Sequence, residues 1–326
     1  MDLWKKLKKE KEHIFVLAPM ADVTDPAFRH IINKYGKPDV FWTEFVSADG
    51  LFLGGFDHLI KDLKYEKEQK PIIAQFFTNK PEMMERASSL AYDLGFDGID
   101  INMGCPDKSI EKQGAGASLI KNPSLAKELV ISAKVGAKGL PVSVKTRVGY
   151  NKEDLENWIP HLLEVSPDLI TIHARTRKEM SLVPARWDLV QKTVKIRDEI
   201  QSGKEEKTLI FGNGDVYSLK QAKDLCLQYD CDGVMFGRAI FGNPWFFSGK
   251  EPSLSQRLSV LIEHTKAFEQ MCGHKNFSIM KKHYKAYVSG FDGAKELRVS
   301  LMETENSKQV EFLIEDFLKR LNVDQL

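Results

Sequence analysis

The residues that could do chemistry gather in one stretch, Gly98 to Pro106, which reads G-I-D-I-N-M-G-C-P. Isoleucines alternate there with Asp100 and Asn102, the pattern of a strand with one apolar and one polar face. Gly104 ends the strand, so Cys105 stands just beyond its carboxyl end. A thiol at such a place is either a small buried apolar group or a reactive group held over a pocket, and its neighbours decide between the two.

Polar side chains also end three neighbouring strand-like segments. V-S-V-K-T-R and L-I-T-I-H-A-R each place two basic residues on one face, and I-I-A-Q ends in an amide. The side chains concerned are Gln75, Lys145, Arg147, His173 and Arg175. Because the carboxyl ends of neighbouring parallel strands meet at one edge, we expect these groups to share a pocket with Asn102 and Cys105. Buried cations need a compensating charge, so the ligand of that pocket should be anionic.

Two glycine turns, each after a strand-like run and before a helix start, could bind the anion. They are F-G-N-G-D, ending at residue 215, and M-F-G-R-A, ending at residue 239. Backbone N–H groups of such turns bind phosphate, and the loops after the last two strands of a barrel are its usual phosphate site. The expected phosphate ligands are Asn213, Gly214, Asp215, Gly237 and Arg238.

Together these polar groups suit flavin mononucleotide (FMN), which joins a planar polar ring to a phosphate. Lys145 would lie near the N1/O2 edge of the ring, where negative charge collects when the ring is reduced. Gln75 would reach a ring carbonyl or imide edge, and the turn Pro19-Met20-Ala21 would pack along the ring. The thiol would then face the ring from across the pocket.

These groups need a scaffold, and the chain supplies eight strand-like runs that alternate with amphipathic helical stretches. The predicted strands are Ile14–Pro19, Val40–Glu44, Ile72–Phe77, Gly98–Asn102, Val142–Arg147, Leu169–His173, Leu209–Gly212 and Gly233–Phe236. Eight such units close most naturally as an α/β fold of the (β/α)8 TIM-barrel type. A doubly wound open sheet is the alternative, but it usually has a G-x-G-x-x-G turn after the first strand, and here that turn reads A-P-M-A-D-V-T-D.

The strand pattern stops at about residue 251, and helical patterns follow. The predicted C-terminal helices are Ser253–Phe268, Ile279–Val288 and Asn306–Leu321. We therefore predict an FMN-binding TIM barrel over residues 1–250 and a small helical domain over residues 251–326.

The composition is that of an ordinary soluble globular protein, with 42% apolar and 29% charged residues among 326. The four cysteines form no C-x-x-C pair, so the sequence predicts neither a zinc site nor a disulfide framework. No apolar run is long enough to span a bilayer, and the amino terminus lacks the apolar core of a secretion signal. We expect a cytoplasmic monomer with no metal and no membrane partner.

The net charge is only +1, which argues against indiscriminate nucleic-acid binding but allows a polarised surface. Two segments are locally basic. Lys5–Lys11 contains five lysines, which we interpret as the solvated face of a helix. Lys275–Arg298, in the predicted helical domain, is the better candidate for contact with nucleic acid.

With these residues in view, the chain resembles the tRNA-dihydrouridine synthase family. The matching motifs run in the family's order over roughly the whole barrel: A-P-M-A-D-V-T-D-P-A-F-R, I-A-Q-F-F, I-D-I-N-M-G-C-P, G-A-G-A-S-L, V-K-T-R, H-A-R-T-R, G-N-G-D and G-R-A. Two motifs depart from the family pattern. L-V-P-A-R-W (Leu182 to Trp187) replaces a glycine-rich G-x-A-D-W stretch, and K-K-H-Y-K-A-Y (Lys281 to Tyr287) lacks the usual starting Arg and the Trp-Tyr pair.

The resemblance implies a flavin-dependent oxidoreductase that reduces uridine in the D-loop region of tRNA to 5,6-dihydrouridine, or forms it reversibly, with NADPH recharging the FMN. A hydride would pass from reduced FMN to C6 of the uracil, and Cys105 would give the proton to C5 as general acid. Asn102 and His173 would hold the base or the flavin edge, and Arg147 and Arg175 would meet RNA or phosphate. The residues expected to hold tRNA are Lys281, Lys282, His283, Lys285 and Arg298.

Two alternatives remain at this point. Another FMN barrel, such as a dihydroorotate-type dehydrogenase or an ene reductase, would share the phosphate site and the strand-5 lysine. It would lack the N-M-G-C-P run and would not need a basic helical tail. A non-catalytic RNA-binding barrel is the second alternative, and a colourless purified protein would support it.

Overall fold

The computed structural model describes residues 3–323, which divide into two compact units. Within these described residues, the barrel unit comprises residues 3–20, 39–63 and 70–237, and the helical unit comprises residues 21–38, 64–69 and 238–323. The boundary expected at residue 250 therefore falls inside the helical unit. That unit also takes two segments from the first quarter of the chain, which the sequence pattern did not separate from the barrel.

The barrel unit contains, within residues 3–323, a single sheet of eight parallel strands in the order β1-β8-β7-β6-β5-β4-β3-β2. The strands are β1 (Ile14–Leu17), β2 (Phe41–Ser47), β3 (Ile72–Phe77), β4 (Gly98–Met103), β5 (Val142–Arg147), β6 (Leu169–His173), β7 (Leu209–Asn213) and β8 (Gly233–Phe236). A parallel bridge between Val16 and Val40 closes the sheet between β1 and the start of β2. The predicted TIM barrel is confirmed, because strict alternation of strands with helices leaves a parallel sheet as the way to pair them.

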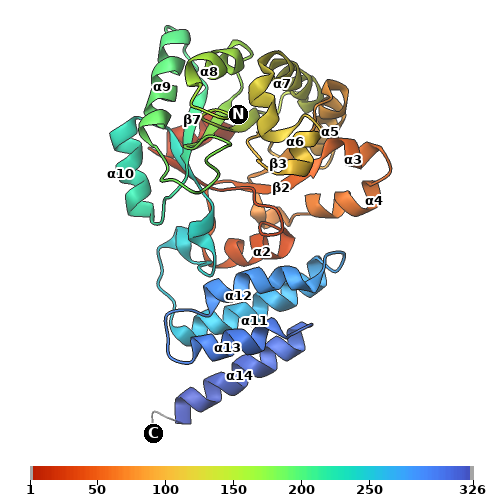
Figure 1. The fold of residues 1–326 in the computed structure, drawn as a ribbon, viewed down its shortest axis with the longest axis vertical. Coiled ribbons are helices and arrows are strands. Elements are labelled where there is room, and N and C mark those ends of the chain that lie inside the picture. The colour runs from red at the N-terminus through yellow and green to blue at the C-terminus, as the bar shows by residue number, and fades with distance from the viewer. Residues whose placement is uncertain (1–2, 324–326) are drawn as a thin grey trace. The chain divides into compact units, whose positions relative to one another are not determined.

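Helices cover the outside of the strands in the barrel unit (Figure 1). They are α3 (Ala48–Phe52), α4 (Phe56–Leu59), α5 (Pro81–Asp93), α6 (Lys108–Lys112), α7 (Pro123–Ala137), α8 (Leu155–Glu164), α9 (Asp188–Ile200) and α10 (Leu219–Tyr229). Local sequence sets several starts: the Asn122 side chain accepts a hydrogen bond from the N–H of Leu125, and Ser218 caps α10 in the same way. Proline in the first turn reinforces the start of α7.

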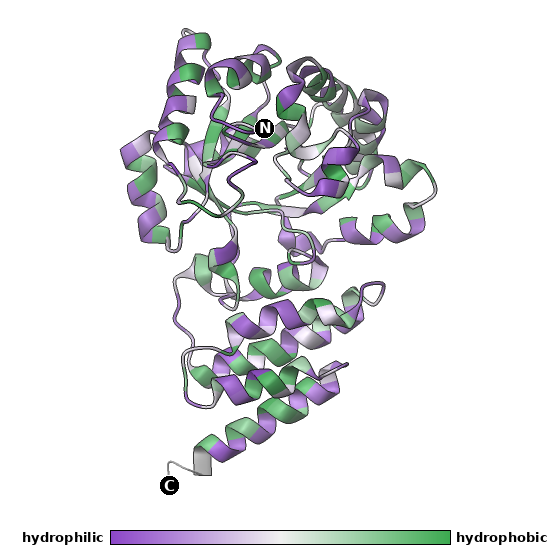
Figure 2. Cartoon of the chain, in the orientation of Figure 1, coloured by the Kyte–Doolittle hydropathy of each residue, from purple (hydrophilic) through white to green (hydrophobic). Residues whose placement is uncertain are grey.

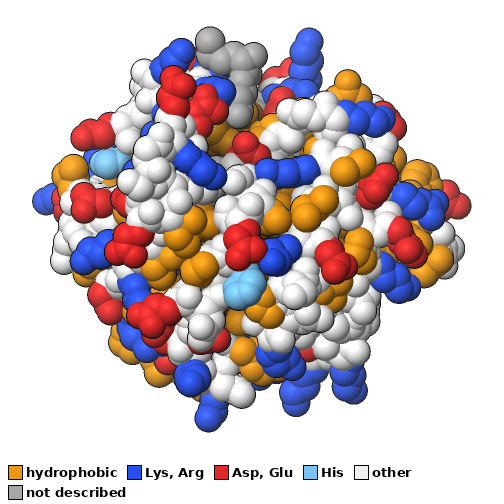
Figure 3. Space-filling view, turned by 90° about the horizontal axis from the view of Figure 1, so that it is seen from above, with side chains coloured by type: hydrophobic (Ala, Val, Ile, Leu, Met, Phe, Trp, Pro, Cys, Tyr) orange, Lys and Arg blue, Asp and Glu red, His pale blue; other side chains and the backbone are white. Residues whose placement is uncertain are grey.

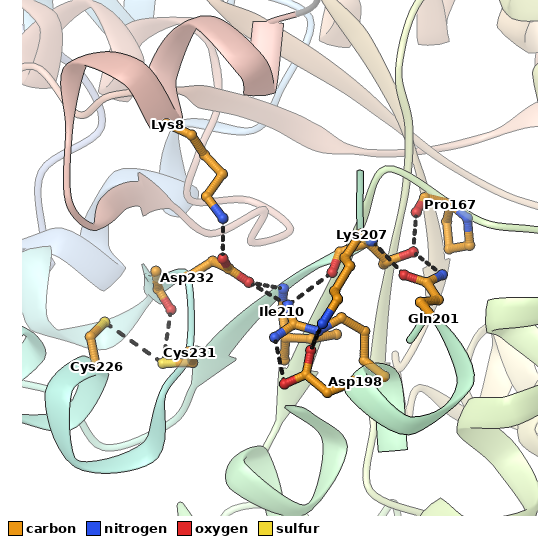
Figure 4. Close-up of polar contacts among 12 residues, drawn as sticks. Lys8, Pro167, Asp198, Gln201, Lys207, Ile210, Cys226, Cys231 and Asp232 are labelled. Carbon is orange, nitrogen blue, oxygen red and sulfur yellow. Dashed lines mark hydrogen bonds and ion pairs between the residues drawn. The ribbon is translucent and has the colours of Figure 1, made fainter. Parts of the chain in front are cut away.

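The amino-terminal helix α1 (Leu3–Glu10) packs against the barrel interior. The indole of Trp4, which is 4% exposed, lies 5.7 Å from the ring of Phe211 in an edge-on contact. Lys8 pairs with Asp232 at 2.7 Å (Figure 4) and Lys5 with Glu206 at 2.5 Å. The interpretation of this basic segment as a solvated face was therefore incomplete, because these two lysines attach the helix to the loops at the amino end of the barrel.

The helical unit packs α2 (Pro26–Tyr35), α11 (Leu254–Met271), α12 (Lys281–Tyr287), α13 (Ala294–Met302) and α14 (Ser307–Val323) around its own apolar core. Hydrophobic and hydrophilic residues alternate along these helices in Figure 2, as expected where one face is buried. A capping box between Ser253 and Gln256 starts α11. Helices α2 and α13 were absent from the predicted set.

The surface carries charges of both signs. Lys and Arg side chains are interspersed with Asp and Glu over the face that Figure 3 shows, in keeping with the net charge of +1. Among the described residues, no helix is long and apolar enough to cross a membrane.

Candidate active site at the carboxyl ends of the strands

Cys105 lies just past β4, and three hydrogen bonds of backbone groups fix the turn that carries it. The side-chain oxygen of Asn102 accepts hydrogen bonds from the N–H groups of Gly104 at 3.1 Å and Cys105 at 2.9 Å. The carbonyl of Cys105 accepts the N–H of Ala117 at 2.9 Å. Gly116 sits beside it with φ +61, where an added Cβ would come within 2.8 Å of that carbonyl, so the G-A-G-A motif is needed for close packing here. The thiol is half-buried, and burial raises its pKa.

A buried carboxylate, Asp100, lies two residues before Asn102 on the same face of β4. It is fully buried and accepts hydrogen bonds from Gln75 Nε2 and Ser143 Oγ, each at 2.5 Å. Gln75 Oε1 in turn accepts from Asn102 Nδ2 at 3.2 Å. Burial raises the pKa of Asp100 to about 6. Sequence reasoning did not select this residue as a site residue, although its alternation with Asn102 was the available signal.

Lys145 stands level with Asn102 on one side and Thr171 on the other. Its ammonium donates a hydrogen bond to Asn213 Oδ1 at 3.3 Å, and no carboxylate among the described residues forms an ion pair with it. Burial, and next the nearby charge of Arg147, lower its pKa to about 8. The hydroxyl of Thr171 is buried without a hydrogen-bond partner in the described part of the chain. Within the described residues, the main partner of the Lys145 ammonium is thus the side-chain amide of Asn213.

The two arginines expected to meet RNA are both buried and occupied by protein groups. Arg147, 6% exposed, donates to the carbonyl of Gly104 at 2.7 Å and to two carbonyls of the loop after β6. Arg175, 2% exposed, forms an ion pair with Asp215 and lies 3.2 Å from Nε2 of His173. In this structure they brace the loops around the site, and their contact with RNA or phosphate stays a prediction.

The glycine turn after β7 packs against the loop of residues 182–187, whose sequence departs from the family pattern. Trp187 lies against Gly212, where an added Cβ would come within 2.3 Å of its ring. Its indole N–H donates to the carbonyl of Gly214, which has φ +123. Asp215 accepts the N–H of Ala185 at 2.8 Å as well as its ion pair with arginine. The carboxylate of Asp215 therefore orders the turn, and the expected phosphate contact through the backbone of this turn stays a prediction.

Of the remaining predicted cofactor residues, Pro19, Met20 and Gly237 belong to the barrel unit. A Cβ added to Gly237 would meet only the sulfur of Met20, at 3.6 Å, so this turn is open. Ala21 and Arg238 belong to the helical unit.

Comparison with known proteins decides the family. A family model described as "Dihydrouridine synthase (Dus)" matches residues 16–322. The chain belongs to the dihydrouridine synthase family. Relatives include a "Probable tRNA-dihydrouridine synthase 2" of Bacillus subtilis (strain 168), 38% identical over 98% of this chain and 97% of that protein. A "Probable tRNA-dihydrouridine synthase" of Staphylococcus aureus (strain MRSA252) is 37% identical over 99% and 98% of the two chains.

Solved structures share the fold of this dihydrouridine synthase family member at low sequence identity. Morphinone reductase matches with a TM-score of 0.51 and 11% identity over 75% of this chain and 88% of its own. An old yellow enzyme homologue from Zymomonas mobilis matches with a TM-score of 0.50 and 12% identity over 74% and 90%. These likenesses support the barrel architecture.

The helical unit of this dihydrouridine synthase family member presents some of the predicted basic residues and buries one of them. His283 is fully buried, with its ring 5.2 Å from that of Phe28, and burial lowers its pKa to about 3. A neutral, enclosed imidazole does not contact phosphate, so the prediction for His283 was wrong. Arg298 donates to the carbonyl of Val288 at 2.7 Å, at the end of α12. The exposed members of that helix are Lys282 and Lys285.

Proposed function

We propose that this protein is an FMN-dependent tRNA-dihydrouridine synthase that reduces uridine in cytoplasmic tRNA to 5,6-dihydrouridine, with NADPH as the source of electrons. Membership of the dihydrouridine synthase family supports the reaction, and the names of its relatives, which are tRNA-dihydrouridine synthases, support tRNA as the substrate. The observation that carries the proposal is a half-buried thiol, held at the carboxyl end of β4 by Asn102, at the same end of the barrel as an unpaired lysine.

The residues present fit FMN. Lys145 is a half-buried cation that forms no ion pair with a carboxylate among the described residues, which suits a ring that gains negative charge on reduction. The unpartnered hydroxyl of Thr171 lies level with it in the sheet. At the last strand, the turn at Gly237 offers backbone N–H groups with open space beside them. Lys145 and Gln75 would hold the ring, and the glycine turns after β7 and β8 would hold the phosphate.

When bound, FMN supplies the hydride for C6 of the uracil. The chain's own contribution is the proton for C5, which the thiol of Cys105 donates. Because burial raises its pKa, this thiol stays protonated at neutral pH and can act as an acid. Asn102 holds the turn that carries the thiol, and the cation of Lys145 stabilises negative charge in the site.

The uridine must leave its stacked position in the folded tRNA to enter the barrel mouth, which costs a few kcal/mol of unstacking. Contacts with phosphates elsewhere on the tRNA offset that cost. The exposed lysines of α12, Lys282 and Lys285, are the proposed contributors from the helical unit. His283 is removed from the proposed set because it is buried.

The decisive experiment maps dihydrouridine in tRNA from cells that lack this protein. We expect specific uridines to lose the modification, and re-expression of the intact chain to restore it. Purified protein should be yellow and should form dihydrouridine in unmodified tRNA when NADPH is supplied. An unchanged dihydrouridine map, together with turnover of free orotate or enones that is indifferent to tRNA, would assign the barrel to another reaction.

A further inference from the structure

A chain of hydrogen bonds runs from the interior of the barrel to the backbone beside the thiol. Asp100, which is fully buried, accepts from Gln75 Nε2. Gln75 Oε1 accepts from Asn102 Nδ2, and Asn102 Oδ1 accepts from the N–H groups of Gly104 and Cys105. Every link is thus an amide or backbone donor, and the only charged group in the chain is the carboxylate at its inner end.

The carboxylate of Asp100 decides in which direction the hydrogen bonds are donated along this series of side chains. An ionised carboxylate can only accept, so it turns the NH₂ group of Gln75 toward itself. The oxygen of Gln75 must then face Asn102, which turns its own NH₂ group inward and its oxygen toward the Cys105 turn. A neutral amide at position 100 could instead donate to Gln75 and reverse both side chains. The two N–H groups of the turn would then face a donor in place of an acceptor.

We propose that Asp100 is a positioning residue, whose ionised carboxylate sets the direction of the amides of Gln75 and Asn102 and thereby holds the Cys105 turn. The inference rests on the proposed function, since it gives the thiol of that same site its orientation. Lys145 faces the same space from β5 and favours the ionised form of the carboxylate, although burial opposes it. At pH 7.5 the carboxylate is ionised, because its pKa is about 6.

The test moves the carboxylate from one end of the hydrogen-bond chain to the other, from position 100 to position 102. Asp100→Asn removes the acceptor-only group, and Asn102→Asp places two acceptors on either side of Gln75. The double variant Asp100→Asn/Asn102→Asp restores a consistent chain that runs the opposite way, with the position-102 carboxylate accepting from the turn and from Gln75. Ser143→Ala is the control, because it removes a donor to Asp100 without changing what Asp100 can accept.

The measurement is amide hydrogen exchange at Gly104 and Cys105 in the purified full chain at pH 7.5, with alkylation of Cys105 as a second probe. We expect each single variant to accelerate exchange at this turn about tenfold, the double variant to return within about twofold of wild type, and Ser143→Ala to change exchange by less than twofold. The restoration is the decisive signature, because a residue that only fills space would make the two changes additive.

Three results would overturn the inference. They are wild-type exchange in Asp100→Asn, a double variant no better than the worse single variant, and an effect of Ser143→Ala as large as that of Asp100→Asn. Should Asp100→Asn fail to fold, recovery of folding in the double variant supports the inference and its absence overturns it. Exchange is measured without turnover, so restoration in a protein that forms no dihydrouridine would reject the proposed function and keep the positioning role.

Discussion

Charged side chains lie at both ends of the barrel, and the pairing of Lys145 at the carboxyl end differs from that of the charges at the amino end. At the amino end, a cleft of about 800 Å³ is lined by α1 and by the loop before β7. There Asp232 accepts from Lys8 at 2.7 Å and Arg197 at 2.9 Å, and Lys207 pairs with Asp198 at 2.8 Å (Figure 4). At the carboxyl end, the described residues offer the ammonium of Lys145 the amide oxygen of Asn213 at 3.3 Å and no ion pair with a carboxylate.

This difference in pairing indicates which charged groups contribute to stability and which are available for binding and catalysis. A buried charge that is paired with an opposite charge is compatible with a stable fold. Removal of one partner lowers the free energy of unfolding, because the other charge is then buried without compensation. A charge left with an amide partner keeps its capacity to bind an anion, at some expense in stability. Arg175 and Asp215 form a matched pair at the carboxyl end as well, so the contrast is between Lys145 and the paired charges. We expect the paired charges of the amino end to serve stability and Lys145 to serve catalysis.

The largest test of this contrast is Cys105→Ala. Removing the proton donor should lower the rate of dihydrouridine formation by roughly 10²–10⁴-fold. Thermal unfolding should stay near wild type, because the half-buried thiol lies at the margin of a small apolar cluster and alanine keeps its Cβ. Dihydrouridine per tRNA and the melting temperature are measured together. Cys272→Ala, in the core of the helical unit, is the matched control and should keep its rate within twofold. Full activity in Cys105→Ala would remove the thiol from the mechanism.

The amino end should give the opposite result. Asp232→Ala removes one of the two carboxylates that the described residues place against the buried guanidinium of Arg197, leaving Asp198, and it removes the acceptor for the N–H of Ile210. The free energy of unfolding should fall by about 3 kcal/mol, with the rate per folded molecule unchanged. Denaturant unfolding and single-turnover kinetics separate the two quantities. A large loss of rate with normal stability would erase the proposed division of labour.

Lys145→Met sharpens the same contrast at the carboxyl end. We expect stability to stay level or rise slightly, because a desolvated cation is removed, while FMN is retained about tenfold less tightly. In the wild-type protein FMN affinity should fall as the pH rises above about 8, since the free lysine loses its proton there, and the variant should not show this dependence. Fluorescence titration of released flavin measures both. Equal retention in the two proteins would show that the lysine does not hold the cofactor.

The sequence predicted the strands and the position of the thiol because these depend on local pattern. Polar residues at strand ends identified Asn102, Lys145 and Gln75 without knowledge of any loop. The partners of Arg147 in the loop after β6 could not be predicted, because no local pattern gives the course of that loop. His283 was misplaced because Phe28, which covers it, comes from a helix more than 250 residues earlier in the chain.

The smallest expected effect lies in the helical unit, where paired and unpaired cations stand on one short helix. Lys282 pairs with Asp22 at 3.1 Å, whereas Lys285 has no ion pair within residues 3–323 that the structure describes. If unpaired cations are kept for ligands here too, Lys285→Glu should raise the KM for tRNA roughly three- to tenfold. Lys282→Glu should raise it less, because part of that charge is already neutralised by Asp22. Oxidation of NADPH without tRNA should be the same in both variants and in wild type. An equal KM in the two variants would mean that ion pairing does not predict which cations contact the RNA. The rule inferred from Lys145, that a cation without an ion pair is available for a ligand, would then not apply to the helical unit.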